Sequence, residues 1–250
     1  MESSSRHEDA LRRMTREQPL RDHARSARSA LCIALILLAA SLLFTTSTLA
    51  AEPASVTFSL DFPNSSPEHY KILVQTDGQA HYESSGKISA DSDARDDYAM
   101  DFVFSDATRA RIFELAAQAH YFSGKVDSGN KKLAFTGAKK LIYKDGQRDS
   151  SADYNYSSQP AVQQLTTLFQ SVAATLEYGR RLVYYHHYQK LALDDELKHM
   201  EDETKRGNLV ELNAVTAVLQ QIYDDSSVMN VVRARAQRIM ILSKTAPAGH

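Results

Sequence analysis

Downstream of an N-terminal apolar stretch, the chain alternates apolar and polar residues, which is the pattern of half-buried β-strands. The alternation is clearest over residues 56–62 and 98–104, where an aromatic or aliphatic residue occupies every second position. Two hairpins are predicted around the Asp-Gly dipeptides at 77–78 and 145–146. We expect two-residue turns at both, because Asp-Gly tolerates the positive φ that such turns require at both central positions.

A loop and a helix are expected between these strands. Residues 86–97 are polar and acidic, so we expect an exposed loop there. The periodicity changes after Ser105, and apolar residues then recur at three- and four-residue spacing up to Ala119. This pattern predicts a helix, and either Ser105 or Asp106 can cap its first turn.

One long amphipathic helix is predicted from Pro160 onward. Apolar residues recur at helical spacing over 162–176, and a proline suits the first turn because its missing N–H costs nothing there. We expect Gly179 to end or bend this helix, with residues 180–190 forming the next helical segment.

Residues 193–242 predict a helical hairpin or a three-helix cap. Acidic residues open its first helix and Gly207 closes it, because acids stabilise a helix N-terminus and glycine accepts the left-handed conformation that ends a helix. Asn208 and Glu211 form a capping-box-like pair for the second helix. The Asp or Ser at 225–226 is expected to cap the third.

Together these patterns predict an α+β fold, in which an antiparallel sheet with two Asp-Gly hairpins packs on helices and is followed by an all-helical C-terminal unit. The expected division of the chain is a signal peptide or membrane anchor at 1–51, an α+β domain at 52–180, a helical unit at 181–244 and a flexible tail at 245–250.

The N-terminal stretch at 30–51 is uncharged; it opens with about 15 strongly apolar residues and ends in small ones. Arginines precede it at positions 21, 25 and 28. This is the layout of a secretory signal peptide, with cleavage expected after Ala50. The alternative is an uncleaved anchor, because the whole stretch is just long enough to cross a bilayer. Either Met1 or Met14 starts translation.

Cysteine content and charge narrow the classes of function. The one cysteine, Cys32, lies in the apolar stretch, so cleavage leaves no disulfide, thiol nucleophile or thiolate metal site. The full chain has 29 basic and 31 acidic residues, of which seven arginines and five acids lie in residues 1–51. The remaining chain therefore has 22 basic and 26 acidic residues, a net charge of −4. This mildly acidic balance argues against nucleic acid as a partner.

Several segments between residues 105 and 182 carry a resemblance to other sequences. They are Ser105–Ala116, Tyr121–Phe122, Tyr143–Gly146, Tyr154–Tyr156, Leu165–Phe169 and Thr175–Leu182. Together they resemble uncharacterised exported bacterial proteins that carry a small α+β domain of unknown function, over about residues 55–180. The resemblance implies export and an α+β fold, and it implies no activity and no catalytic residues.

The densest cluster of chemically versatile side chains is the run Tyr-Tyr-His-His-Tyr at 184–188. The candidate binding residues in this run are Tyr184, His186, His187 and Tyr188. Adjacent positions on a helix project about 100° apart, so the two histidines do not face one metal ion from the same side. The acids at 194–195 approach them only through a turn. We expect the tyrosines to pack between helices and the histidines to lie at the rim; the alternative is a metal or ligand site.

These observations favour a non-enzymatic exported module that binds a protein or a cell-envelope component, in the periplasm or outside the cell. No cofactor is expected, because the sequence has no phosphate-binding glycine loop, Gly-x-Ser-x-Gly or His-Glu-x-x-His motif. The alternative function is a metal-dependent or other hydrolase that uses the region of His186 and His187. If the signal is not cleaved, residues 30–51 tether the protein to the inner membrane.

Overall fold

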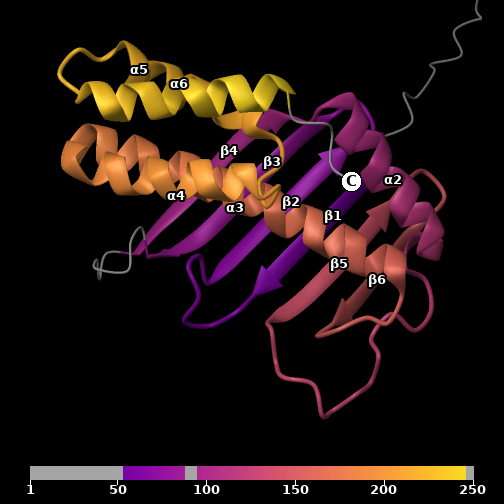
Figure 1. Cartoon of the computed structure of the whole chain (residues 1–250). Coiled ribbons are helices and arrows are strands. Elements are labelled where there is room, and N and C mark those ends of the chain that lie inside the picture. Colours follow the sequence, from indigo (N-terminus) through magenta and orange to yellow (C-terminus); the bar gives the residue numbers. More distant parts are fainter. Residues whose placement is uncertain (1–52, 88–94, 246–250) are drawn as a thin grey trace, which may run out of the picture. The chain divides into compact units, whose positions relative to one another are not determined.

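The computed structural model describes residues 53–87 and 95–245 of the chain (Figure 1). The described residues fall within one compact unit of the chain. The predicted signal peptide or anchor lies outside the described residues, as do residues 246–250 of the predicted tail, whereas Thr245 ends the last helix. Within the described part, no helix combines the length and apolar character needed to span a membrane.

Six antiparallel strands form one sheet in the order β4-β3-β2-β1-β5-β6, which confirms the predicted α+β fold (Figure 1). The strands are β1 (Ser55–Asp61), β2 (His69–Gln75), β3 (Gln79–Lys87), β4 (Arg95–Val103), β5 (Ala138–Lys144) and β6 (Asp149–Tyr154). The alternating positions Val56, Phe58 and Leu60 are buried on the helix-covered face, as the periodicity predicts.

Both predicted hairpins form, but neither has the expected two-residue turn. Three residues, 76–78, separate β2 from β3, and Gly78 has a φ of +92° while its N–H donates to the carbonyl oxygen of Gln75. This three-residue connection requires only one left-handed residue, so the aspartate before the glycine needs no positive φ. Four residues separate β5 from β6, where the Asp145 carboxylate accepts the N–H groups of Gln147 and Arg148.

The prediction of an exposed loop over 86–97 is wrong at both ends of the range, where the structure has strands. Strand β3 continues to Lys87 and β4 begins at Arg95, with Gly86 paired to Asp96. Charged residues are tolerated because β4 is an edge strand, with one side open to solvent. Residues 88–94 lie outside the described part of the chain.

Five α-helices complete the described fold: α2 (Asp106–Gln118), α3 (Pro160–Tyr188), α4 (Leu193–Lys205), α5 (Thr216–Asp224) and α6 (Asn230–Thr245). Helices α2 and α3 lie against each other over one face of the sheet (Figure 1). Ser105 caps α2 by accepting the N–H of Thr108, one of the two caps the sequence allowed.

Helix α3 crosses the whole sheet. Near its start, the hydroxyls of Thr166 and Tyr154 of β6 lie 2.6 Å apart, and in its first half Phe169 stacks on Phe58 of β1 with ring centroids 5.3 Å apart. Further along, Glu177 accepts a hydrogen bond from Tyr82 of β3. One element therefore packs on the edge strand β6, on the inner strand β1 and on β3, the strand next to the other edge.

The predicted end of the helix at Gly179 is wrong, because α3 continues to Tyr188; the alternative, a bend at this residue, stays a prediction. A β-carbon at Gly179 would lie 2.5 Å from the Cγ1 atom of Val215, which belongs to the short 3₁₀ helix Leu212–Val215. The glycine is therefore explained by close packing of a neighbouring segment on the helix. The boundary drawn between residues 180 and 181 falls inside this continuous helix.

The three-helix C-terminal unit is confirmed, and so is its closing glycine. Gly207 has a φ of +77°, and the N–H of Asn208 donates to the carbonyl oxygen of Glu203, which satisfies the end of α4. The predicted capping box is wrong, because Glu211 is left-handed and accepts the N–H and the hydroxyl of Ser105, at 3.0 and 2.6 Å.

The predicted cap on the last helix is also wrong. Helix α6 begins at Asn230, four residues beyond the expected cap, and the Asp225 carboxylate instead accepts the N–H of Ser227 and the side chains of His186 and Lys190. Both partners, His186 on α3 and Lys190 just after it, are remote in sequence, so a local capping pattern gives no sign of them.

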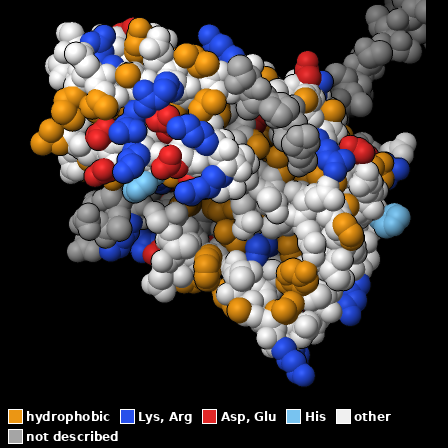
Figure 2. Space-filling model, viewed as in Figure 1, with side chains coloured by type: hydrophobic (Ala, Val, Ile, Leu, Met, Phe, Trp, Pro, Cys, Tyr) orange, Lys and Arg blue, Asp and Glu red, His pale blue; other side chains and the backbone are white. Residues whose placement is uncertain are grey.

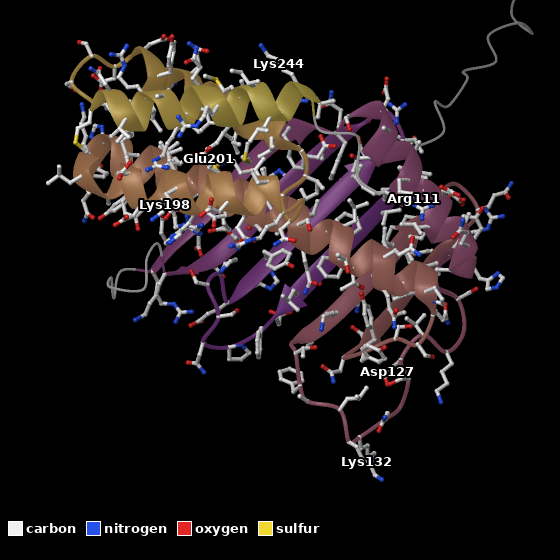
Figure 3. The ribbon with its side chains drawn as sticks, viewed as in Figure 1. Arg111, Asp127, Lys132, Lys198, Glu201 and Lys244 are labelled. Atoms are coloured by element: carbon white, nitrogen blue, oxygen red, sulfur yellow. The ribbon has the colours of Figure 1, made fainter. Side chains whose placement is uncertain are left out.

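Ion pairs hold the C-terminal helices together. Basic and acidic side chains are interspersed over these helices (Figure 2). Glu201 lies between α4 and α6 (Figure 3), where its carboxylate accepts two hydrogen bonds of 2.9 Å from Arg238 and one of 2.7 Å from Lys205. The Arg238 guanidinium, with Lys205, lowers the pKa of Glu201 to about 2. The carboxylate therefore stays charged at neutral pH.

Gly179→Ala tests the close packing on α3. We expect it to lower the free energy of unfolding by about 1 kcal/mol, because the overpacking of a stiff, buried Val215 outweighs the gain in helix propensity. In a Val215→Ala background the same change should become stabilising. Denaturant unfolding of the four chains measures this reversal; an equal effect in both backgrounds would contradict it. Gly146→Ala, where a β-carbon meets nothing within 4 Å, is the control.

Candidate functional site

A hollow of about 680 Å³ lies where the C-terminal end of α3 meets β4 and α5. All four candidate residues from the sequence, Tyr184, His186, His187 and Tyr188, line it. The other lining residues are Asp96, Tyr98, Arg180, Val183, Lys190, Gln221 and Asp225. The hollow therefore combines aromatic, cationic and acidic groups from three parts of the chain.

The two histidines do not act together. Atom Nε2 of His186 lies 2.9 Å from Oδ2 of Asp225, and the side chain is 20 % exposed. The ring of His187 is exposed and stands edge-on to Tyr188, with centroids 4.3 Å apart. Asp194, one of the two acids that could reach the histidines only through a turn, pairs with Arg235 of α6.

Asp225 connects the end of α3 to the segment that follows α5. Its carboxylate accepts hydrogen bonds from Lys190, at 2.7 Å, and from the hydroxyl of Ser227, at 2.6 Å, in addition to its contact with His186. Lys190 first, then Ser227 and His186, holds the pKa of Asp225 below its usual range. This residue therefore fixes one wall of the hollow.

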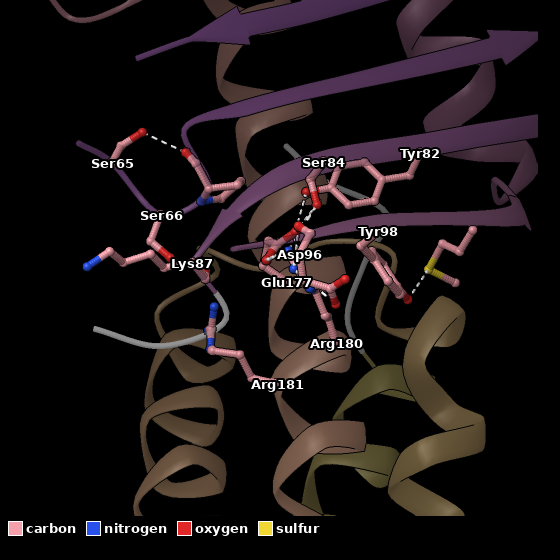
Figure 4. Close-up of polar contacts among 12 residues, drawn as sticks. Ser65, Ser66, Tyr82, Ser84, Lys87, Asp96, Tyr98, Glu177, Arg180 and Arg181 are labelled. Atoms are coloured by element: carbon pink, nitrogen blue, oxygen red, sulfur yellow. Dashed lines mark hydrogen bonds and ion pairs between the residues drawn. The ribbon is translucent and has the colours of Figure 1, made fainter. Parts of the chain in front are cut away.

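The inner end of the hollow rests on a buried ion pair between Glu177 and Arg180, each with a side chain only 5 % exposed (Figure 4). The carboxylate of Glu177 accepts the hydroxyls of Tyr82 and Ser84 at 2.7 Å each. Burial, followed by the charge of Glu177, raises the pKa of Tyr82 well above its ordinary value. The tyrosine hydroxyl thus stays a hydrogen-bond donor.

Arg180 extends this network from α3 to the edge strand. Its Nη2 donates to the backbone oxygen of Asp96 at 2.9 Å and lies 3.6 Å from that residue's carboxylate (Figure 4). The guanidinium also lies over the ring of Tyr98, 5.4 Å from its centroid. Within the described residues, its buried Nε has no hydrogen-bond partner.

Glu177 and Arg180 are not among the site residues predicted from the sequence, although a signal is present. Both fall on the stripe of buried positions that runs along α3 through Phe169, Ala173 and Leu176. Charged residues three positions apart on an apolar stripe indicate a buried pair, since charges enter a core only when they are partnered. Asp225 gave no such signal, because its partners, His186 on α3 and Lys190 just after it, are more than thirty residues away.

A second hollow, of about 450 Å³, lies beside β6 and the start of α3. Lys139 lines it with only 5 % of its surface exposed, and its ammonium donates to the backbone oxygens of Thr136, Gly137 and Asn155. Burial lowers the pKa of Lys139. The oxygens that this ammonium contacts are all uncharged, so this lysine fastens the loop before β5 to the end of β6.

Neither hollow contains a recognisable metal centre. Over residues 53–87 and 95–245, no three His, Cys, Asp or Glu side chains are grouped so that they could hold a metal ion. Comparison of the sequence with protein-family models and with curated proteins gives no match. The candidate site is therefore defined by its own geometry: a partly aromatic hollow above a buried Glu–Arg pair.

Glu177→Gln tests the buried pair. We expect it to lower the free energy of unfolding by roughly 2–4 kcal/mol, because Arg180 then loses a buried charge partner and two hydroxyls lose a charged acceptor. Glu196→Gln on α4, which breaks the more exposed pair with Arg181, is the matched control and should cost at most about 1 kcal/mol. Equal losses in urea unfolding of the two variants would contradict this account.

Proposed function

We propose that the chain is an exported module that binds a protein or cell-envelope component and catalyses no reaction. The observation that carries this proposal is the exposed apolar surface beside the hollow. Val183, Tyr188 and Leu191 are 55, 68 and 83 % exposed, and Tyr184 packs against Tyr188 with ring centroids 5.1 Å apart. These four residues are called the tyrosine patch.

The chemistry of the tyrosine patch supports protein binding. Tyrosine offers a large contact area with few rotatable bonds and a polar tip, and it is enriched where binding energy concentrates. Three residues of the patch line the hollow, which can take up part of a partner, and the ion pair between Lys190 and Asp225 lines the same hollow. An apolar centre with a polar rim is the usual anatomy of a recognition surface.

The competing hydrolase function rests on the contact between His186 and Asp225, which resembles a base held by a carboxylate. In the part of the chain that the structure describes, the only side-chain hydrogen bond found for His186 is the one to Asp225, so no hydroxyl nucleophile is paired with it. Ser227 is near, but its hydroxyl donates to Asp225. These contacts favour a binding role.

Site-specific photocrosslinking tests the binding surface. Benzoylphenylalanine at position 188 should crosslink to a discrete partner in intact source cells, because Tyr188 is the most exposed aromatic residue of the patch. The matched control is the same residue at Phe135, which is 57 % exposed and lies in the loop before β5. Products at 188 that are absent at 135 support the proposal; identical products from both positions, or none from 188, would argue against it.

Export is tested at the N-terminus of the protein purified from its own cells. Mass spectrometry should find a chain that starts at Ala51 or Glu52, since the small residues before them suit signal cleavage. A protein that retains residues 30–51 and sediments with membranes would instead support the anchored form. A full-length chain in the soluble cytoplasmic fraction would contradict export altogether.

A further inference from the structure

The guanidinium of Arg180 is poorly satisfied for a group with so little exposed surface. An arginine offers five N–H donors, and buried donors are normally all paired. Here Nη2 has one good acceptor at 2.9 Å, the contacts of Nη1 with Ser84 and Glu177 are long at 3.4 and 3.5 Å, and Nε has none in the described part of the chain. A buried cation with spare donors at the wall of a hollow favours an anion there.

Resting on the proposed binding function, we propose that Arg180 binds a carboxylate of the partner, and that the hollow receives the aromatic or apolar residue that bears or adjoins it. A carboxylate matches the planar fork of arginine and accepts two parallel hydrogen bonds from it. The occupant is therefore a peptide segment whose acidic side chain or terminal carboxylate lies next to an apolar side chain.

The charges around the hollow define which anion fits. Arg180 and Lys190 are its permanent cations, with His186 and His187 beside them, and Asp96 and Asp225 are its lining acids. Asp225 is already held by Lys190 and His186, and Glu177 behind the wall is held by Tyr82 and Ser84. With Glu177 and Asp96 already close to the guanidinium, a singly charged carboxylate is favoured over a doubly charged phosphate.

Asp96 occupies the place that the partner's carboxylate takes. Its side chain is 55 % exposed and 3.6 Å from Nη2 of Arg180, so the pairing is loose and open to exchange with an incoming carboxylate. Its backbone oxygen, in contrast, is a firm acceptor at 2.9 Å that does not depend on the side chain. Replacing the carboxylate alone therefore removes this loose partner of the guanidinium and leaves its hydrogen bond to the strand in place.

The walls suit the body of such a ligand. Tyr98, Tyr184 and Tyr188 line the hollow on two sides, and tyrosine rings stack well on aromatic and aliphatic groups. The volume of about 680 Å³ exceeds that of one amino-acid side chain and lies in the usual range of ligand sites.

Titration of the purified full chain with N-acetyl-L-tyrosine and with N-acetyl-L-tyrosinamide tests the proposal, because the two probes differ only in the carboxylate. Calorimetry should show the acid binding at least about tenfold more tightly than the amide, as expected for a hydrogen bond to a charged group. Side-chain NMR should show the Nε–H of Arg180 shifting with the acid alone. Equal affinities, or no binding of either probe, would overturn the proposal.

Two variants separate ligand binding from a structural role. Asp96→Asn should raise the affinity for the acid about threefold or more and leave the amide unchanged, because it removes a competing carboxylate. Arg180→Lys, checked for folding by thermal unfolding, should lower the affinity for the acid about tenfold, because lysine lacks the planar guanidinium that binds a carboxylate through two hydrogen bonds. If Arg180 only supports the fold, the Asp96→Asn variant will bind the acid with the affinity of the unchanged protein. That result would overturn the proposal. If the carboxylate proposal fails in this way but position 188 still crosslinks to a discrete partner, the proposed binding function is retained.

Discussion

The rest of the structure depends on the burial of helix α3 on two sides at once. One side packs across the sheet, from Tyr154 of β6 to Tyr82 of β3, and the other receives Val215 against the bare surface of Gly179. Because the helix continues without interruption through this contact, the sheet and the C-terminal helices share one central element. The shared helix fixes where the hollow forms, since the hollow lies at the end of α3 that extends past β4.

That placement puts a charged pair into the buried wall of the hollow, where it stabilises the fold less than an apolar pair would. Burying Glu177 and Arg180 costs desolvation energy that an apolar pair would not incur, and the long contacts between them recover only part of it. Polar groups left incompletely satisfied in a native core are uncommon, and they concentrate at sites of function. The proposed carboxylate gives this arrangement a physical purpose, because the partner supplies acceptors that the fold leaves out.

The sequence reveals the parts of the fold that local rules determine. Alternation predicts the strands, Ser105 is among the predicted caps of α2, and Gly207 ends α4 as expected. Prediction from the sequence fails where a residue contacts a partner that is remote along the chain. Glu211 looks like a local capping residue but turns to Ser105, and Gly179 looks like a helix breaker but makes room for Val215. For the site, the tyrosines and histidines were visible in the sequence, whereas the residues that organise the hollow depend on contacts from β3, β4 and the segment after α5.

Native-state hydrogen exchange along α3 tests this account most directly. If one helix unites the two parts, amides near Phe169, over the sheet, and amides near Arg180, beside the hollow, should open with the same free energy, together with the amides of α4. An opening of lower free energy that includes the end of α3 and the C-terminal helices, while the amides over the sheet stay protected, would contradict it. The C-terminal helices would then be a separate unit, and the wall of the hollow would not be fixed by the core.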